Sequence, residues 1–381
     1  MLTVFLDLMG FGLIIPILPN YAKDLGATDA MVGLLGTSFS IMQFLFASFW
    51  GGLSDKYGRR PIMLVSILLM AVAYVLFANA NVLWLLFATR LLKGFAAANL
   101  SVAQAYISDV VPLNERTKAF GMIGAAFGFG FVFGPPIGGV LKEAYGIAGV
   151  GYFAAALALV NFVLALAFLK ETLVERAERV QLFPNPFKDI LRFRKSPEIA
   201  SLFTINFVYV LGFSMMQITS TLLWSEHFEL NDAQIGYTFA FIGILAVIIQ
   251  GGLIGKFNQW FGERNLLVYG TFFVAIGLFS MPFVPKNMFW LELVSLTFLS
   301  LGNALLTPTV SSLLSNHAPK DAQGKVLGTN QSIGSLSRVL GPAIGGATYG
   351  LFYTFPYLLA GGISLVVTVL ALRLRRKQIS G

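Results

Sequence analysis

The sequence contains no cysteine and only two histidines in 381 residues. Without cysteine there are no disulfides, iron–sulfur clusters or thiolate nucleophiles. His227 and His317 fall in predicted loops, which argues against a histidine-based metal site. No Walker-type glycine loop is present, which argues against coupling to ATP. We therefore expect no cofactor, no bound metal and no enzymatic activity.

Charge is also scarce, at 12% of residues against about 25% in an average soluble domain. Hydrophobic residues make up 56% of the chain, and the mean hydropathy is +0.77. Several charge-free runs reach the roughly 20 residues that cross a bilayer as a helix, and none alternates with the period of a membrane strand. The pattern predicts an all-α membrane protein of twelve spans near 3–23, 30–52, 61–79, 82–106, 118–141, 149–169, 197–224, 233–254, 265–285, 288–314, 326–350 and 354–372.

The net charge of +8 reflects membrane topology rather than nucleic-acid binding. With the N-terminus inside, twenty of the 26 Lys and Arg residues fall in cytoplasmic segments, as the positive-inside rule requires. The apolar start of the chain lacks a basic region and carries Asp7, so it is interpreted as the first span and not as a signal peptide. We expect a multi-pass protein of a bacterial plasma membrane, with both termini in the cytoplasm and with lipid as its surroundings.

A charged, proline-containing segment divides the chain. Residues 170–198 hold twelve of the 44 charged residues. This predicts a six-helix bundle at 1–169, a cytoplasmic linker at 170–196 and a second bundle with a short basic tail at 197–381. Within the linker, 187–195 (FKDILRFRK) is typical of an amphipathic helix on the membrane surface.

The two halves resemble each other. PLNERTKAFG followed by GPPIGG recurs as PKDAQGKVLG followed by GPAIGG at an offset of 207, and Gly51-Gly52-Leu53 recurs at an offset of 200. Parallel six-span repeats of this kind are a transporter architecture in which the substrate binds between the halves at mid-membrane.

The loop Gly51-Gly52-Leu53-Ser54-Asp55-Lys56-Tyr57-Gly58-Arg59-Arg60-Pro61 connects the second and third spans. Glycine permits the tight reversal, and proline suits the first turn of the next helix. These features are also compatible with a simple basic turn. The positive-inside rule accounts for the basic residues of such a turn but not for the acid Asp55. The loop is similar to the signature of the major facilitator superfamily.

Two further segments extend this resemblance. Gly128–Gly139 (GFGFVFGPPIGG) resembles the fifth-span motif of proton-driven drug antiporters within the superfamily. Leu6–Pro19 (LDLMGFGLIIPILP) is similar to the first span of tetracycline efflux pumps, and Arg90 with Gly94 resembles the fourth-span motif with a buried arginine. The third span has no acid, unlike tetracycline pumps.

The resemblance implies roles for particular residues. Asp55 would latch one conformation by facing the start of the eleventh span, where a helix N-terminus favours negative charge. Arg59 would pair with Asp109. The repeat has Gly255 in place of Asp55, so we expect a one-sided latch. Close packing and helix bending are expected at Gly130, Gly134, Pro135, Gly138, Gly341 and Pro342.

Ionisable residues within spans are functional candidates because burying their charge is costly. They are Asp7, Arg90, Lys93, Glu292 and Arg338, of which Asp7, Arg90 and Glu292 are the predicted proton-coupling residues. Capping or hydration of the inner helix end is the alternative role for Asp7, and a merely interfacial position is the alternative for Glu292. Uncharged or aromatic residues predicted to line the substrate cavity with Arg338 are Asn99, Asn206, Tyr209, Phe213, Gln217, Asn330 and Gln331, although any of them can instead bond neighbouring helices.

The leading hypothesis is a monomeric secondary transporter that exports small amphipathic or lipophilic compounds in exchange for protons by alternating access. A lipid flippase and a proton-coupled sugar or organic-acid transporter remain the alternatives. The three intramembrane cations outnumber the two acids, so an anionic or zwitterionic substrate stays open.

Overall fold

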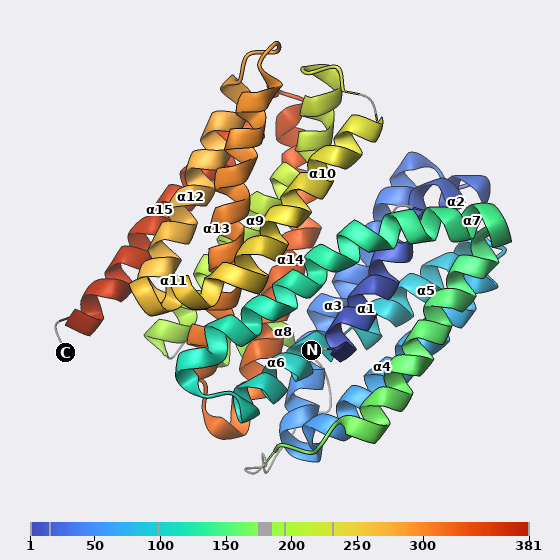
Figure 1. Cartoon of the computed structure of the whole chain (residues 1–381), viewed down its shortest axis with the longest axis horizontal. Coiled ribbons are helices and arrows are strands. Elements are labelled where there is room, and N and C mark those ends of the chain that lie inside the picture. The colour runs from blue at the N-terminus through green and yellow to red at the C-terminus, as the bar shows by residue number, and fades with distance from the viewer. Residues whose placement is uncertain are drawn as a thin grey trace. The chain divides into compact units, whose positions relative to one another are not determined.

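The computed structural model describes residues 2–14, 17–97, 99–173, 185–193, 196–230 and 232–379. Within these ranges the first half comprises α1 (Leu2–Ile14), α2 (Leu18–Asp24), α3 (Asp29–Tyr57), α4 (Arg59–Ala78), α5 (Leu83–Ala96), α6 (Asn99–Val110), η1 (Leu113–Glu115), α7 (Arg116–Phe168) and the linker helix α8 (Pro186–Phe193). The second half comprises α9 (Pro197–Glu226), α10 (Asp232–Ala246), η2 (Val247–Leu253), α11 (Ile254–Phe261), α12 (Glu263–Ser280), η3 (Met281–Phe283), α13 (Phe289–His317), η4 (Lys320–Ala322), α14 (Gln323–Tyr349) and α15 (Phe355–Ile379) (Figure 1).

Among the described residues, nine helical segments are long and apolar enough to cross a membrane. One of them, Leu113–Phe168, contains two predicted spans, because Gly146 adopts φ 67° and breaks α7 (Figure 1). The first span begins with the shorter apolar helix Leu2–Ile14, and α14, the predicted eleventh span, is too polar to be counted among the nine. The helices thus follow the order of the twelve predicted spans.

Close contacts divide the chain into two units, each described by itself. The first unit comprises Met1–Pro112, Ala126–Arg192 and Ala318–Ser335. The second comprises Leu113–Ala125, Phe193–His317 and Leu336–Gly381. These units differ from the two predicted bundles, because the start of α14 packs in the first unit and the start of α7 packs in the second.

Glycines bring α1 and α7 together within the first unit. A Cβ added at Gly134 would lie 2.6 Å from the backbone of Gly12, and one at Gly138 would lie 2.5 Å from the carbonyl oxygen of Leu13. Gly130 meets the backbone of Leu8 in the same way. Backbones approach this closely only where side chains are absent, so a larger residue at these positions would push the helices apart.

The second unit contains a comparable contact. A Cβ at Gly341 of α14 would lie 2.6 Å from the Ser214 side chain of α9. Pro342 lies inside α14, where it removes one backbone hydrogen bond and favours bending. The side chain of Pro135, the other predicted bending residue, lies outside the described residues.

Candidate functional site

Asp55 lies at the end of α3 and is 1% exposed. Its Oδ1 accepts a hydrogen bond from the backbone N–H of Gly324, and its Oδ2 accepts one from the N–H of Lys325, both at 2.8 Å. These are among the first N–H groups of α14, which have no partner within their own helix. The carboxylate therefore caps α14 from α3. Its negative charge faces the positive N-terminal end of the α14 dipole, which is a favourable interaction.

Arg59 holds this carboxylate in place. It is fully buried, and its Nη1 donates to Asp55 Oδ1 at 2.5 Å and to Ser54 Oγ at 2.8 Å. Its Nε donates to Asp109 Oδ2 at 2.9 Å, at the end of α6. The structure thus brings together all three residues that the loop motif assigned to a latch, although the latch role itself remains a prediction.

The N-terminus of α4 receives a cap from the beginning of the linker. The backbone N–H groups of Arg59 and Arg60 donate to the Glu171 carboxylate at 2.9 and 3.2 Å. Gly58, at φ 109°, leaves room for it, because a Cβ there would lie 2.3 Å from Glu171 Oε2. Partial burial alone would raise the pKa of Glu171, but backbone donors at Leu173, Arg59, Thr172 and Arg60 outweigh burial and lower that pKa below its ordinary 4.5.

We expect Glu171→Gln to lower the free energy of unfolding by about 1 kcal/mol, the usual contribution of a helix cap. Because folding lowers the pKa of Glu171, the stabilisation is complete above pH 4.5 and is lost as the pH falls through the folded pKa. Unfolding curves of the detergent-solubilised protein between pH 3 and 7 measure this. The difference between wild type and variant should be full at pH 7 and shrink in acid. Glu143→Gln, at an exposed acid, should show no such difference, and a pH-independent loss would argue against the cap.

The linker helix α8 also packs in the first unit. Asp189 is 3% exposed, and its carboxylate accepts hydrogen bonds from Ser48 Oγ of α3 at 2.5 Å and from Lys325 Nζ of α14 at 2.8 Å. Phe187 and Leu191, on other sides of the helix, are about 60% exposed. The amphipathic pattern predicted the helix, but it did not predict a buried carboxylate that joins the linker to Lys325, whose backbone N–H also donates to Asp55.

The second repeat carries an analogous contact that the sequence analysis missed. Glu263, at the start of α12, accepts hydrogen bonds from Thr117 Oγ1 of α7 at 2.6 Å and from Asn316 Nδ2 of α13 at 3.2 Å. Arg116 Nη1 donates to Ser315 and Asn316 beside it. The second repeat thus has no carboxylate at Gly255, the position aligned with Asp55, but it joins α12 to α7 through Glu263 at a different position. The expectation of a one-sided latch stays a prediction.

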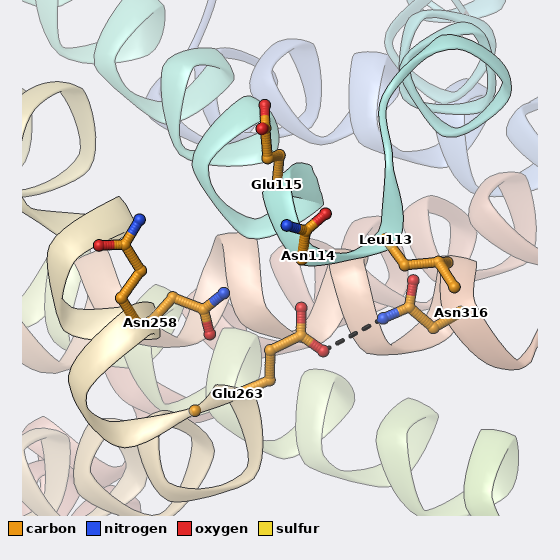
Figure 2. Close-up of a pocket in the computed structure, with 8 residues that line it drawn as sticks. Leu113, Asn114, Glu115, Asn258, Glu263 and Asn316 are labelled. Carbon is orange, nitrogen blue, oxygen red and sulfur yellow. Dashed lines mark hydrogen bonds between the residues drawn. The ribbon is translucent and has the colours of Figure 1, made fainter.

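A polar cavity of about 460 Å³ opens beside Glu263. Figure 2 shows Glu263 and Asn316 joined by their hydrogen bond, with Asn114 and Glu115 on the opposite wall and Asn258 to the side. This cavity lies at the ends of α11 and α13, outside the predicted substrate cavity. Among the described residues, no group of three or more His, Asp or Glu side chains is placed to hold a metal ion.

A second group of buried charges in the first unit lies on α1 and α5. Asp7 is 7% exposed, and its Oδ1 accepts a hydrogen bond from Asn161 Nδ2 at 2.8 Å. Arg90 and Lys93, one turn apart on α5, are 5% and 4% exposed. Lys93 lies within electrostatic range of both Asp7 and Arg90. The structure therefore places Asp7 near the basic pair of α5, and it adds Asn161, which lies in a charge-free run that gave no signal in the sequence.

Glu292 is fully buried in the second unit, where its Oε1 accepts a hydrogen bond from Trp224 Nε1 at 2.9 Å. Glu292 also lies in the first turn of α13, so both its proton-coupling role and the alternative of an interfacial position stay predictions. Its depth along α13 was readable from the sequence, but its burial depends on Trp224 of α9, a neighbour that only the fold identifies.

The predicted cavity residues fall into different surroundings. In the second unit, Tyr209 Oη donates to Asn303, its ring lies 6.1 Å from that of Phe213, and it interacts electrostatically with Arg338. Asn206 is half-buried and Gln217 is exposed. In the first unit, Asn330 is buried and Gln331 half-buried on α14. The side chain of Asn99 lies outside the described residues. Among the described residues of this set, Tyr209, Phe213 and Arg338 are brought together.

The sequence model of the Major Facilitator Superfamily matches residues 1–286 and 202–380. The chain belongs to this superfamily. It is a multi-pass membrane transporter of small molecules with the major facilitator fold, and it is not an enzyme.

Known members of the superfamily align with almost the whole chain. Tetracycline resistance protein, class C, of Escherichia coli is 31% identical over 91% of this chain and 88% of its own length. Multidrug resistance protein 2 of Bacillus subtilis (strain 168) is 32% identical over 96% and 91%. The crystal structure of the human organic anion transporter MFSD10 (TETRAN) matches with a TM-score of 0.89 at 25% identity, over 97% of each chain.

Proposed function

We propose that this chain exports small amphipathic or lipophilic compounds in exchange for protons, as a monomer in a bacterial plasma membrane with both termini in the cytoplasm. The names of its relatives, which include tetracycline, multidrug and quinolone resistance proteins, support export of drug-like compounds. The observation that carries the proton-coupling part is Asp7, a carboxyl group 7% exposed on a membrane helix. Burying an acid within a membrane span is costly, and acids that are kept there usually mark the path of a proton or substrate.

Alternating access provides the mechanism. The two halves expose a central site first to one side and then to the other. Asp55 stabilises one state by capping α14, and its contacts are released in the other. A proton entering from outside neutralises Asp7, and its release inward resets the carrier.

A growth-inhibition panel in an efflux-deficient host tests the function. Expression of the chain should raise the inhibitory concentration of at least one lipophilic compound, and inverted vesicles should accumulate that compound only with an imposed proton gradient. A panel without any shift would contradict drug export. Accumulation that persists after an uncoupler collapses the gradient would contradict proton coupling.

A second candidate is transport of organic anions. It is favoured by the buried basic pair Arg90 and Lys93 and by the likeness to a human organic anion transporter. The same vesicles, supplied with a lipophilic carboxylate, distinguish it from export of neutral or cationic compounds.

A further inference from the structure

Hydrogen-bond donors without a partner converge inside the first unit. Lys93 Nζ, Arg90 Nε and Nη1, and Tyr74 Oη are all buried, and within the described part of the chain none of these atoms has a hydrogen-bond partner. The exposed fractions of the three side chains are 4%, 5% and 2%. Buried donors in folded proteins are nearly always satisfied, so a cluster of them requires an explanation.

Aromatic rings surround these donors. Lys93 Nζ lies 4.4 Å from the ring centre of Tyr74 and 4.9 Å from that of Phe11, and the Arg90 guanidinium lies 5.1 Å from that of Phe39. Tyr74 is pressed against α1, since a Cβ at Gly10 would lie 2.7 Å from its hydroxyl oxygen. The cluster therefore has cationic and hydroxyl donors at its centre and flat apolar surfaces around them.

The charges within the cluster do not balance. Within the described residues, Asp7 is the acid in electrostatic range of Lys93. When Asp7, Arg90 and Lys93 are all ionised, the cluster carries one negative and two positive charges. Its Oδ1 is already bonded to Asn161. Cation–π contacts stabilise the two bases in part. They do not replace the hydrogen bonds that an ammonium or guanidinium loses on leaving water, and the loss is larger for charged groups than for neutral ones.

We propose that Lys93, Arg90 and Tyr74 form a binding site for the anionic group of a lipophilic substrate, with a carboxylate as the best match. A carboxylate supplies acceptors for several donors at once and the missing negative charge. The rings of Phe11, Phe39 and Tyr74 provide the apolar surface for the body of such a molecule. This inference deepens the proposed transport function and rests on it for the direction of movement, but the binding itself does not depend on protons.

Binding of matched fluorescent probes to the full chain tests the site. 4-(1-Pyrenyl)butanoate, its N-methylamide and pyrenylbutyl-trimethylammonium share one aromatic body and differ in head-group charge. In phosphatidylcholine nanodiscs without any gradient, the wild type should bind the carboxylate most tightly. Lys93→Gln should weaken carboxylate binding about 10- to 150-fold, the range of a hydrogen bond to a charged group, and leave the amide unchanged. Lys93→Arg should restore most of the preference.

Lys170→Gln removes an exposed lysine and should change nothing. Equal affinities of the wild type for carboxylate and amide, or equal losses of both in Lys93→Gln, would overturn the proposal. Loss of the Lys93-dependent preference when the nanodiscs contain phosphatidylglycerol would assign the site to a lipid phosphate instead. Because no proton gradient is present, a Lys93-dependent preference without transport in vesicles would refute the proposed function alone, and transport without this preference would refute the anion site alone.

Discussion

Asp55→Asn is expected to shift the chain away from the state in which α3 and α14 are joined. The variant keeps the shape of the side chain but loses the negative charge that faces the N-terminus of α14 and the guanidinium of Arg59. Coupling energies between such states are about 1–3 kcal/mol, so the ratio of the two populations should change roughly 5- to 150-fold. Transport should weaken while folding is largely retained, because Arg59 still has Asp109 as a partner.

The absence of native cysteine makes this shift measurable. Thr329→Cys places a single thiol on α14 at a position that is fully buried and bonded to Ser48 Oγ. Adding Asp55→Asn should accelerate its labelling by a membrane-impermeant maleimide from the predicted cytoplasmic side. Asp321→Asn, at an exposed acid just before α14, is the matched control and should not. Unchanged labelling together with unchanged transport would show that Asp55 is only part of a turn.

The fold was predictable because the membrane imposes a simple rule on sequence. A run of about 20 apolar residues forms a helix, since no other local structure satisfies its backbone in lipid. The offset of 207 between Pro112 and Pro319 likewise reflects an architectural repeat. Hydropathy places the ends of the helices only to within several residues. The structure adds breaks that do not interrupt the apolar pattern, such as Gly146, which has a positive φ and separates two spans.

The Glu263 contact was missed because the repeat changes register. Gly51 corresponds to Gly251 at an offset of 200, but the two left-handed glycines that begin α4 and α12, Gly58 and Gly262, are 204 apart. The second copy is thus longer by four residues, about one helical turn, and contains the π-helical segment η2. An alignment on the glycines of the motif therefore pairs Asp55 with Gly255. It gives no reason to single out Glu263, the acid that follows Gly262.

The residues of the candidate sites were easier to predict than their partners. Charge inside an apolar run identifies Asp7, Arg90 and Lys93 without any structure. Their neighbours are not identifiable in this way, because Asn161 and Tyr74 resemble ordinary polar and aromatic residues of a membrane helix. Which of them face the charges depends on how α1, α4, α5 and α7 pack, and packing is decided by contacts distant in sequence, such as Gly12 with Gly134.

Asp7→Asn is expected to abolish uphill transport. The carboxyl group is buried, hydrogen-bonded to Asn161 and in electrostatic range of Lys93, so it has the surroundings of a group that exchanges a proton during the cycle. A proton crossing 100 mV supplies about 2.3 kcal/mol, which biases transport tens-fold. Asparagine keeps the size of the side chain and its ability to bond Asn161, but it cannot carry the proton. Accumulation against a gradient should therefore disappear while downhill exchange and substrate binding remain.

Proteoliposomes with an imposed pH gradient measure this directly. Asp7→Asn should equilibrate the substrate to equal concentrations on both sides, and its substrate binding should no longer depend on pH. Asp24→Asn, at an exposed acid at the end of α2, should pump like the wild type. If Asp7→Asn still pumps uphill at the wild-type rate, the proton carrier lies elsewhere, and Glu292→Gln becomes the decisive variant because Glu292 is the buried acid of the second unit that bonds Trp224. Loss of binding together with transport would instead indicate that Asp7 contacts the substrate and does not serve the proton alone.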